Sequence, residues 1–200
     1  MENVRERLLE AAHAVFAEEG YRGATTRRIA ARAGVNEVTL FRHFAGKDEL
    51  LAAAIDRQVE VSKARIDSAP LPGTPGDIRR ELEGFLAAVL AGFCAAQQGA
   101  RTSMGEWGHH PELDHRLTGT SNHIAGRLER YLRAAQELGL IRSDIHPVVA
   151  AQVVLAPVFA HGVLHGMTPE RFPLGPDESI RAYLNVLLEG LVHAPGQGGD

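Results

Sequence analysis

The chain has 200 residues, of which 44% are hydrophobic and 23% are charged, a composition that is typical of a soluble globular protein and excludes a disordered chain. Its formal net charge is -4, but residues 20–47 carry six basic residues against one acidic residue, a local charge of +5 that leaves -9 for the remainder. A basic patch near one end of an acidic body is the charge distribution expected of a nucleic-acid-binding protein.

Cellular location is indicated by the cysteine content and by the apolar segments. The single cysteine, Cys94, excludes an intrachain disulfide, and the charged residues among the first ten exclude a secretory signal. The longest apolar run, around residues 148–160, is interrupted by Gln152 and Pro157 and falls short of the roughly 18 residues of a membrane span. The sequence therefore predicts a cytoplasmic protein without a membrane segment.

Apolar residues recur at the helical spacing of three or four along the chain, and no segment alternates with the period of a strand. The sequence therefore predicts an all-α fold. We expect a three-helix N-terminal domain over residues 1–46, a connecting helix over 47–67, a larger helical domain over 74–194 and a disordered tail over 195–200.

Three helices are predicted in the N-terminal domain. The first ends at Gly20, a residue suited to the left-handed conformation that follows a helix. The second begins at Thr25 or Thr26, whose hydroxyl can cap free amides, and the third begins after an Asn36 cap. Helix, short helix, tight turn and short helix form a helix-turn-helix, in which the second short helix enters the DNA major groove.

Longer helices follow in the rest of the chain. Thr74 and Pro75 favour a helix start, and the absence of charge over residues 85–96 predicts a helix that is buried all round. Short helical material is expected around residues 102–107. Longer amphipathic or apolar helices are expected over residues 113–138, 147–165 and 177–193.

A family resemblance rests on residues 25–44, TTRRIAARAGVNEVTLFRHF, and on KDEL at residues 47–50. These segments resemble the DNA-binding domain of the tetracycline-repressor (TetR) family. The rest of the chain is similar to that family only in helix order and in the turn GLIRSD at residues 139–144. The resemblance implies a transcriptional repressor that binds palindromic operator DNA as a homodimer and is released by a small, mostly apolar effector.

The resemblance also implies which residues contact DNA. Threonines at the start of the second helix would donate to phosphates, residues at the start of the third would face base edges, and cationic side chains would hold the backbone. The expected contacts are Thr25, Thr26, Arg27, Arg28, Asn36, Glu37, Val38, Thr39, Phe41, Arg42, His43 and Lys47. The alternative is a solvated basic face on an ordinary three-helix bundle.

Two of these residues depart from simple expectation. Phe41 stands where the family commonly has tyrosine, so a phosphate-binding hydroxyl is missing, and packing within the small domain is an equal interpretation. Glu37 can accept a hydrogen bond from a cytosine amino group, but a carboxylate near phosphates also weakens binding.

Bulky side chains from several elements predict a mainly apolar effector pocket around the uncharged helix. The expected lining residues are Phe85, Val89, Phe93, Met104, Trp107, Tyr131, Phe159 and His165. Each of them, taken singly, is better interpreted as an ordinary core residue, so the prediction of a pocket rests on the set.

Histidines raise the question of a metal. His161 and His165 have the i, i+4 spacing that can bring two imidazoles to one ion, but no third ligand is fixed by the sequence. We therefore predict no metal and no cofactor, and we interpret these histidines as partly buried or interface residues. The adjacent His109 and His110 can be ligand contacts or simply part of a loop.

Dimerisation through the last two helices, which pair with their twofold mates in a four-helix bundle, is implied by the family. Apolar stripes on both helices agree with it, although burial within one chain would give the same stripes. The expected interface residues are Val154, Val158, His161, Tyr183, Leu184, Leu187, Leu188 and Leu191.

Two other classes of function compete with this one. An enzyme is disfavoured because the sequence has no Gly-x-Ser-x-Gly elbow, no His-Glu-x-x-His and no glycine-rich phosphate loop. A DNA-binding dimer with no small-molecule effector remains the second candidate.

Overall fold

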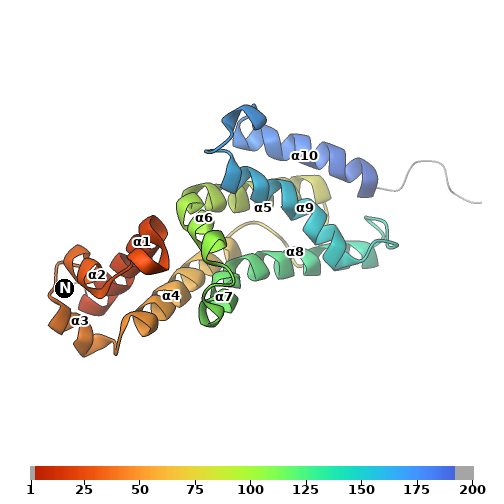
Figure 1. Cartoon of the computed structure of the whole chain (residues 1–200). Coiled ribbons are helices and arrows are strands. Elements are labelled where there is room, and N and C mark those ends of the chain that lie inside the picture. The colour runs from red at the N-terminus through yellow and green to blue at the C-terminus, as the bar shows by residue number, and fades with distance from the viewer. Residues whose placement is uncertain (1–2, 192–200) are drawn as a thin grey trace, which may run out of the picture. The chain divides into compact units, whose positions relative to one another are not determined.

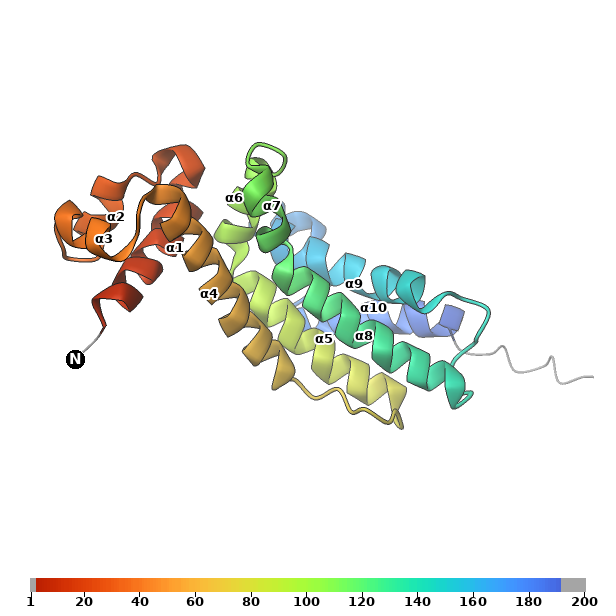
Figure 2. The same cartoon turned by 90° about the horizontal axis from the view of Figure 1, so that it is seen from below.

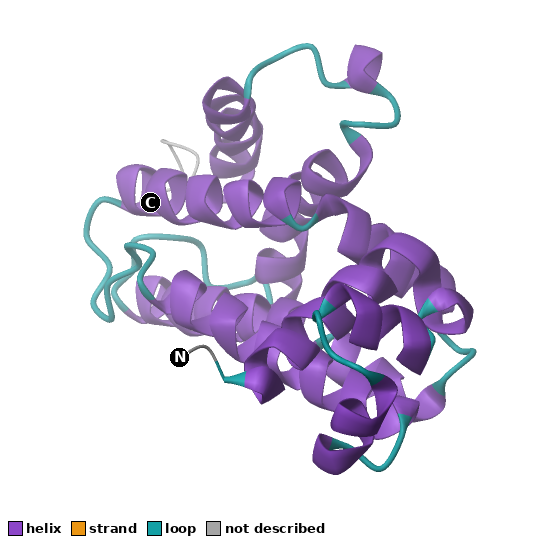
Figure 3. Cartoon of the chain, turned by 90° about the vertical axis from the view of Figure 1, so that its left-hand side faces the viewer, coloured by secondary structure: helices purple, strands orange, loops and turns teal. Residues whose placement is uncertain are grey.

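The computed structural model describes residues 3–191, which form helices without any strand (Figure 1, Figure 3), so the predicted all-α fold is confirmed. One 3-10 helix spans Pro169–Arg171. The α-helices of this described part are α1 Val4–Gly23, α2 Thr26–Arg32, α3 Glu37–His43, α4 Lys47–Asp67, α5 Ile78–Ala95, α6 Gln97–Glu106, α7 Pro111–Leu117, α8 Gly119–Glu137, α9 Pro147–Leu164 and α10 Pro176–Leu191.

The chain divides into two compact units, and each unit is made of two stretches of sequence. Unit 1 consists of Met1–Ala64 and Ala96–Thr120, and unit 2 consists of Arg65–Ala95 and Ser121–Asp200. Unit 1 therefore joins α6 and α7 to the predicted N-terminal domain, whereas α5, α9, α10 and nearly all of α8 belong to unit 2. The predicted tail over residues 195–200 lies outside the described residues.

The core of unit 1 forms where the first four helices meet. Leu8 of α1, Ile29 of α2, Leu40 of α3 and Leu50 of α4 are all fully buried in it. Each of these helices is short or amphipathic, and burial of its apolar face supplies most of its stability. Helix α6 packs along α1 in the same unit.

Helix α1 is interrupted at Gly20, whose φ of 70° and ψ of -175° are non-helical. Only glycine adopts this backbone conformation without strain. The prediction that the first helix ends at Gly20 is close, because the helical turn that follows reaches only to Gly23 before α2 begins.

Unit 2 has its own core, in which α5 packs against α9 and α10 (Figure 2). Tyr131 of α8 donates a hydrogen bond from its hydroxyl to Oε2 of Glu81 on α5, at 2.6 Å. Burial and this hydrogen bond raise the pKa of Tyr131 well above its ordinary value, so the phenol stays a donor. This bond connects α8 to α5 at a partly buried position.

The expectation that residues 85–96 are buried all round is wrong. Phe85 and Leu86 are fully buried, but Ala91 and Cys94 are exposed. Small apolar residues lose little by facing water, so a segment without charge does not have to be buried on every face.

The start of α5 also differs from the prediction by a few residues. The helix begins at Ile78, and Oδ1 of Asp77 accepts a hydrogen bond from the amide of Arg80 at 3.1 Å. The Glu81 carboxylate reaches back to the amides of Gly76 and Asp77. An acidic cap therefore takes the place of the predicted Thr74 and Pro75 start.

The prediction of a single long helix over residues 113–138 is wrong as well, because helical structure is interrupted at Thr118, between α7 and α8. The Thr118 hydroxyl donates to the carbonyl oxygen of His115 at 3.1 Å. Hydroxyl side chains that bond to the preceding turn compete with helix continuation. The seven-residue gap between Leu117 and Ile124 in the apolar pattern coincides with this break.

Helix α9 is apolar on two opposite faces. Ala150, Val154 and Val158 are buried in the core of unit 2, whereas Val149 and Val153 are exposed. By length and composition α9, Pro147–Leu164, is one helix of the described residues that could cross a bilayer, and 39% of it is buried inside the chain.

The helix that contains the apolar run around residues 148–160 has 18 residues, so it is longer than the run from which no membrane segment was predicted. An apolar helix of a core passes the same test, so length and composition alone carry little weight here. The two apolar faces explain the composition, since one face packs inside unit 2 and the other has no cover within the described chain.

Candidate nucleic-acid interface

The starts of α2 and α3 are capped as the sequence predicts. The Thr25 side chain accepts a hydrogen bond from the amide of Arg28 at 3.3 Å, and Asn36 Oδ1 accepts one from the amide of Thr39 at 2.8 Å. Gly34, with a φ of 66°, makes the tight turn between the two helices. This is the helix-turn-helix arrangement, with α3 in the place of the recognition helix.

Helix α3 turns one side to the core and the other to solvent. Leu40 is fully buried, whereas Val38 is 63% exposed and Phe41 is 52% exposed. Arg42 and His43 are exposed on the last turn of the same helix. The exposure of Phe41 disfavours the interpretation that it merely packs within the domain, and it leaves an apolar and cationic surface free to meet DNA.

Glu37 is held by the neighbouring helix. The Thr26 hydroxyl donates to Oε1 of Glu37 at 2.8 Å, which ties the first residue of α2 to the first residue of α3. In this arrangement the Thr26 hydroxyl proton is used by Glu37 and is not available to a phosphate, whereas Oε2 of Glu37 takes no part in the bond. The DNA contacts expected of Thr26 and Glu37 remain predictions, and the Thr26 contact requires this hydrogen bond to open.

The basic residues of the segment fall into two groups. Arg28 forms an ion pair with Glu19, and Arg32 forms one with Glu18 at 2.5 Å, so both are partly neutralised by α1. Arg27 and Arg42 are exposed, and within residues 3–191 no acidic partner is found for either. Arg27 and Arg42 are therefore the better candidates for phosphate contacts.

Lys47 lies at the start of α4 and points toward Tyr21. Its ammonium donates to the backbone oxygen of Tyr21 and lies 3.8 Å from the centroid of the Tyr21 ring. Partial burial lowers the pKa of Lys47, against the opposing effect of Asp48 and Glu106. The expected phosphate contact of Lys47 stays a prediction, and it competes with these contacts to Tyr21.

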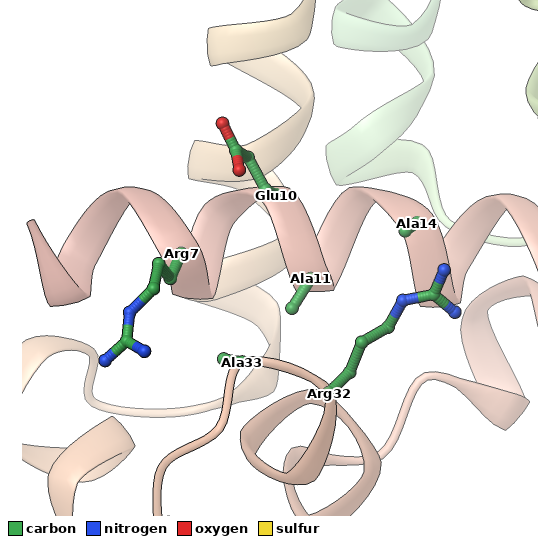
Figure 4. Close-up of a pocket in the computed structure, with 6 residues that line it drawn as sticks. All are labelled: Arg7, Glu10, Ala11, Ala14, Arg32 and Ala33. Carbon is green, nitrogen blue, oxygen red and sulfur yellow. The ribbon is translucent and has the colours of Figure 1, made fainter. Parts of the chain in front are cut away.

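A surface hollow of about 350 Å³ lies between α1 and α2 in unit 1 (Figure 4). Its walls combine three alanines with charged side chains, and they are Arg7, Glu10, Ala11, Ala14, Arg32 and Ala33. A hollow with charges of both signs does not match the mostly apolar pocket expected for an effector.

The predicted effector residues do not all belong to one unit. Met104 and Trp107 are exposed residues of unit 1, whereas the other six lie in unit 2. Phe93 and Phe159 are partly buried and meet edge to face, with their ring centroids 5.3 Å apart. The remaining members of unit 2 are Phe85, Val89 and Tyr131, which are buried in its core, and His165, which is exposed.

His161 stands at the centre of an aromatic cluster in unit 2. It is 1% exposed, its Nδ1 lies 3.2 Å from the Tyr183 hydroxyl, and its ring stacks on His165 at 5.3 Å. Burial, with a smaller effect of His165, lowers the pKa of His161. No group of three or more metal-binding side chains gathers among the described residues, and two imidazoles alone do not make a zinc site.

The predicted interface stripe is mostly internal to one chain. Val154, Val158, His161, Leu184 and Leu188 are buried in unit 2, which is the second interpretation that the sequence left open. Tyr183 and Leu187 are partly buried against the same core. The side chain of Leu191 lies outside the described residues.

The sequence pattern did not reveal which apolar side chains of the same two helices are exposed, a set called here the exposed stripe. It consists of Val149, Val153 and Leu164 on α9 and Val186 on α10. Its signal was present in the sequence, because α9 is apolar on both faces, but the pattern alone does not tell which face packs inside the chain.

Comparison with known proteins agrees with this geometry. Residues 8–54 match the sequence model of bacterial regulatory proteins of the tetR family. The HTH-type transcriptional regulator YvkB of Bacillus subtilis, described as uncharacterised, is 26% identical over 188 residues, which cover 94% of this chain and 96% of the relative.

Two solved structures share the architecture. SmeT, the repressor of the Stenotrophomonas maltophilia multidrug efflux pump SmeDEF, is 26% identical with a TM-score of 0.63, covering 100% of this chain and 97% of SmeT. FadR from Bacillus subtilis, solved in complex with stearoyl-CoA, is 18% identical with a TM-score of 0.70, covering 94% of this chain and 99% of FadR. The second likeness shows the fold alone.

The capped helices, the exposed face of α3 and the family match define a helix-turn-helix DNA-binding protein. Residues 8–54 carry the DNA-binding domain of the tetR family, as the sequence resemblance implies, and over its length the chain is similar to HTH-type transcriptional regulators. The named relatives are regulators, which agrees with a function other than catalysis.

Proposed function

We propose that this regulator is a repressor that binds palindromic operator DNA as a homodimer and is released by a small, mostly apolar effector. The observation that carries the DNA-binding part is the solvent-facing side of α3. Val38 and Phe41 provide apolar surface for base edges, and Arg42 provides a cation for the backbone. The Asn36 cap fixes the start of this helix.

Two arguments support the dimer in this proposal. A recognition helix of seven residues reads too few bases to find one operator, and two of them about 34 to 36 Å apart read two half-sites. The exposed stripe of Val149, Val153, Leu164 and Val186 is an apolar surface that a second copy can cover. A protein without this pairing would bind DNA with little specificity.

An effector is supported by the relatives and by unit 2. SmeT has been solved as a triclosan complex and FadR in complex with stearoyl-CoA, and triclosan and the stearoyl chain are apolar. The partly buried Phe93 and Phe159 are the candidate contacts for such a molecule in this chain.

The test is reciprocal, because an effector that weakens DNA binding must itself bind less tightly, by the same factor, when DNA is saturating. Equal effector affinity with and without DNA would favour the second candidate, a DNA-binding dimer without an effector.

Replacing Val38 by alanine is expected to change which DNA sequences are preferred more than it changes overall affinity. Val38 is exposed on the groove side of α3, where an apolar side chain can meet a thymine methyl group. Duplexes are selected from a randomised library by the wild-type protein and by the variant, and the enriched sequences are compared. Val61→Ala is the matched control, since Val61 is an exposed valine of α4 outside the helix-turn-helix. Identical enrichment for Val38→Ala and wild type would contradict the role of Val38, and no enrichment by wild type would contradict the proposed function.

Arg42→Ala is expected to weaken binding to all duplexes and to lower the slope of log affinity against log salt by about 0.9, the value for one phosphate contact. Lys47→Ala should change this slope less, because the Lys47 ammonium is engaged with Tyr21. Fluorescence anisotropy over a series of salt concentrations measures both slopes. A larger change for Lys47→Ala than for Arg42→Ala would reverse this assignment.

A further inference from the structure

Two side chains of α6 form hydrogen bonds with the backbone groups that lose their helical partners at the break in α1. In an unbroken helix the amide of Tyr21 donates to the carbonyl of Ala17. Here the Tyr21 amide donates to Oε1 of Glu106 at 2.8 Å, and the Ala17 carbonyl accepts from the Thr102 hydroxyl at 2.7 Å. Both contacts lie inside unit 1 and connect positions 85 residues apart in the sequence.

The geometry of α6 and of Gly20 suits this arrangement. Thr102 and Glu106 are four residues apart on one helix, so they lie on the same face. A Cβ at Gly20 would lie 2.5 Å from Oε1 of Glu106, so glycine both makes the break and lets the carboxylate approach. The donor and the acceptor exposed by the break are thus each satisfied by α6.

Tyr21, the residue held by Glu106, is in turn the contact point for several groups. Its ring contacts that of His110 at a centroid distance of 3.6 Å and an interplanar angle of 31°, and its hydroxyl donates to Asp48 at 2.5 Å. Its backbone oxygen and ring both contact Lys47. Tyr21 therefore connects the end of α1 to the start of α4, immediately before the segment that leads to the Thr25 cap of α2.

We propose that Thr102 and Glu106 are positioning residues for DNA binding, although neither belongs to the helix-turn-helix. This proposal rests on the proposed function. With α6 in contact with α1, residues 21–25 have one conformation and α2 and α3 keep the orientation that DNA requires. When α6 moves away from α1, the Ala17 carbonyl loses its bond to Thr102 and the Tyr21 amide loses its bond to Glu106. The orientation of α2 and α3 is then lost.

The test compares disruptive and conservative variants of the full-length protein. Glu106→Ala and Thr102→Val remove the acceptor and the donor, whereas Glu106→Gln and Thr102→Ser retain them. Gln98→Ala, at an exposed position of α6, is the matched control. Affinity is measured for the duplex that the wild-type protein selects from a randomised library, at a temperature where circular dichroism shows every variant to be fully helical.

We expect Glu106→Ala and Thr102→Val to lower affinity about tenfold or more, within the usual range of coupling between sites, and the other three variants to bind as wild type does. Two further measurements do not depend on DNA. Hydrogen exchange of the Tyr21 amide should become faster in Glu106→Ala, and the fluorescence of Trp107, the single tryptophan of the chain and the neighbour of Glu106, should change in both disruptive variants.

Three outcomes are decisive. Wild-type affinity in both disruptive variants would overturn the proposal, and so would an equal loss in the conservative variants or in Gln98→Ala. Faster Tyr21 exchange without any loss of affinity would also overturn it, because the contacts would then stabilise α1 without positioning the DNA-binding helices. If the wild-type protein selects no duplex, the proposed function fails, and this result is distinct because it is seen before any variant is tested.

Discussion

Replacing Gly162 by alanine is expected to destabilise unit 2 by about 1–3 kcal/mol, the usual cost of overpacking a core. A Cβ at this position would lie 2.3 Å from Cβ of Phe93 and 3.3 Å from its Cγ, so α9 and α5 would have to move apart. The nearest atom is the Cβ of Phe93, which does not move when the side chain rotates, so rotation of the side chain cannot relieve the overlap.

Urea unfolding followed by circular dichroism measures this effect, with Gly126→Ala as the matched control. Gly126 is in the interior of α8, and only the flexible end of Arg130, at 3.6 Å, is near its would-be Cβ. Alanine there should raise stability by about 0.5–1 kcal/mol, since it favours the helix. If Gly162→Ala proved as stable as Gly126→Ala, the close approach of α5 and α9 would be contradicted.

Val186→Glu is expected to convert the dimer into monomers and to lower operator affinity by at least tenfold. Val186 is 75% exposed in a single chain, so the substitution leaves the core of unit 2 intact. In a dimer that covers the stripe on α9 and α10, the same carboxylate would be buried without a partner, which costs several kcal/mol. The loss of the second half-site then weakens DNA binding.

Sedimentation velocity measures the oligomeric state, and anisotropy measures DNA affinity. Val61→Glu is the control, because Val61 is a 50% exposed valine outside the stripe and should leave both quantities unchanged. Leu187→Glu is a less specific test, since Leu187 packs partly against the core of its own chain. A Val186→Glu variant that sediments as a dimer at the wild-type concentration would show that this surface is not the interface.

Local chemistry made the DNA-binding region predictable. The caps at Thr25 and Asn36 and the positive φ of Gly34 depend on residues within a few positions of one another, so the sequence displays them directly. The ends of α2 and α3 followed within a residue or two. The same reasoning located Gly20, although it did not reveal the short turn beyond it.

Contacts between distant residues were not predictable in the same way. The hydrogen bonds between Thr102 and Ala17 and between Tyr21 and Glu106 join residues 85 positions apart. The sequence around either residue of a pair does not indicate which residue is its partner. The apolar faces of α9 posed a different difficulty, because periodicity identifies a stripe without telling whether it meets its own chain or another molecule. The break at Thr118 depended on one hydroxyl bonding to the preceding turn.

The division of unit 1 into two stretches of sequence has a consequence for chimeric regulators. Exchange of residues 1–46 alone, whether by recombination or by design, would place the broken α1 against a foreign α6. The recipient would then need its own threonine and carboxylate at the positions of Thr102 and Glu106 to satisfy Ala17 and Tyr21. A chimera that is to acquire new DNA specificity should therefore receive Gln97–Glu106 together with the helix-turn-helix, so that both segments come from the same protein.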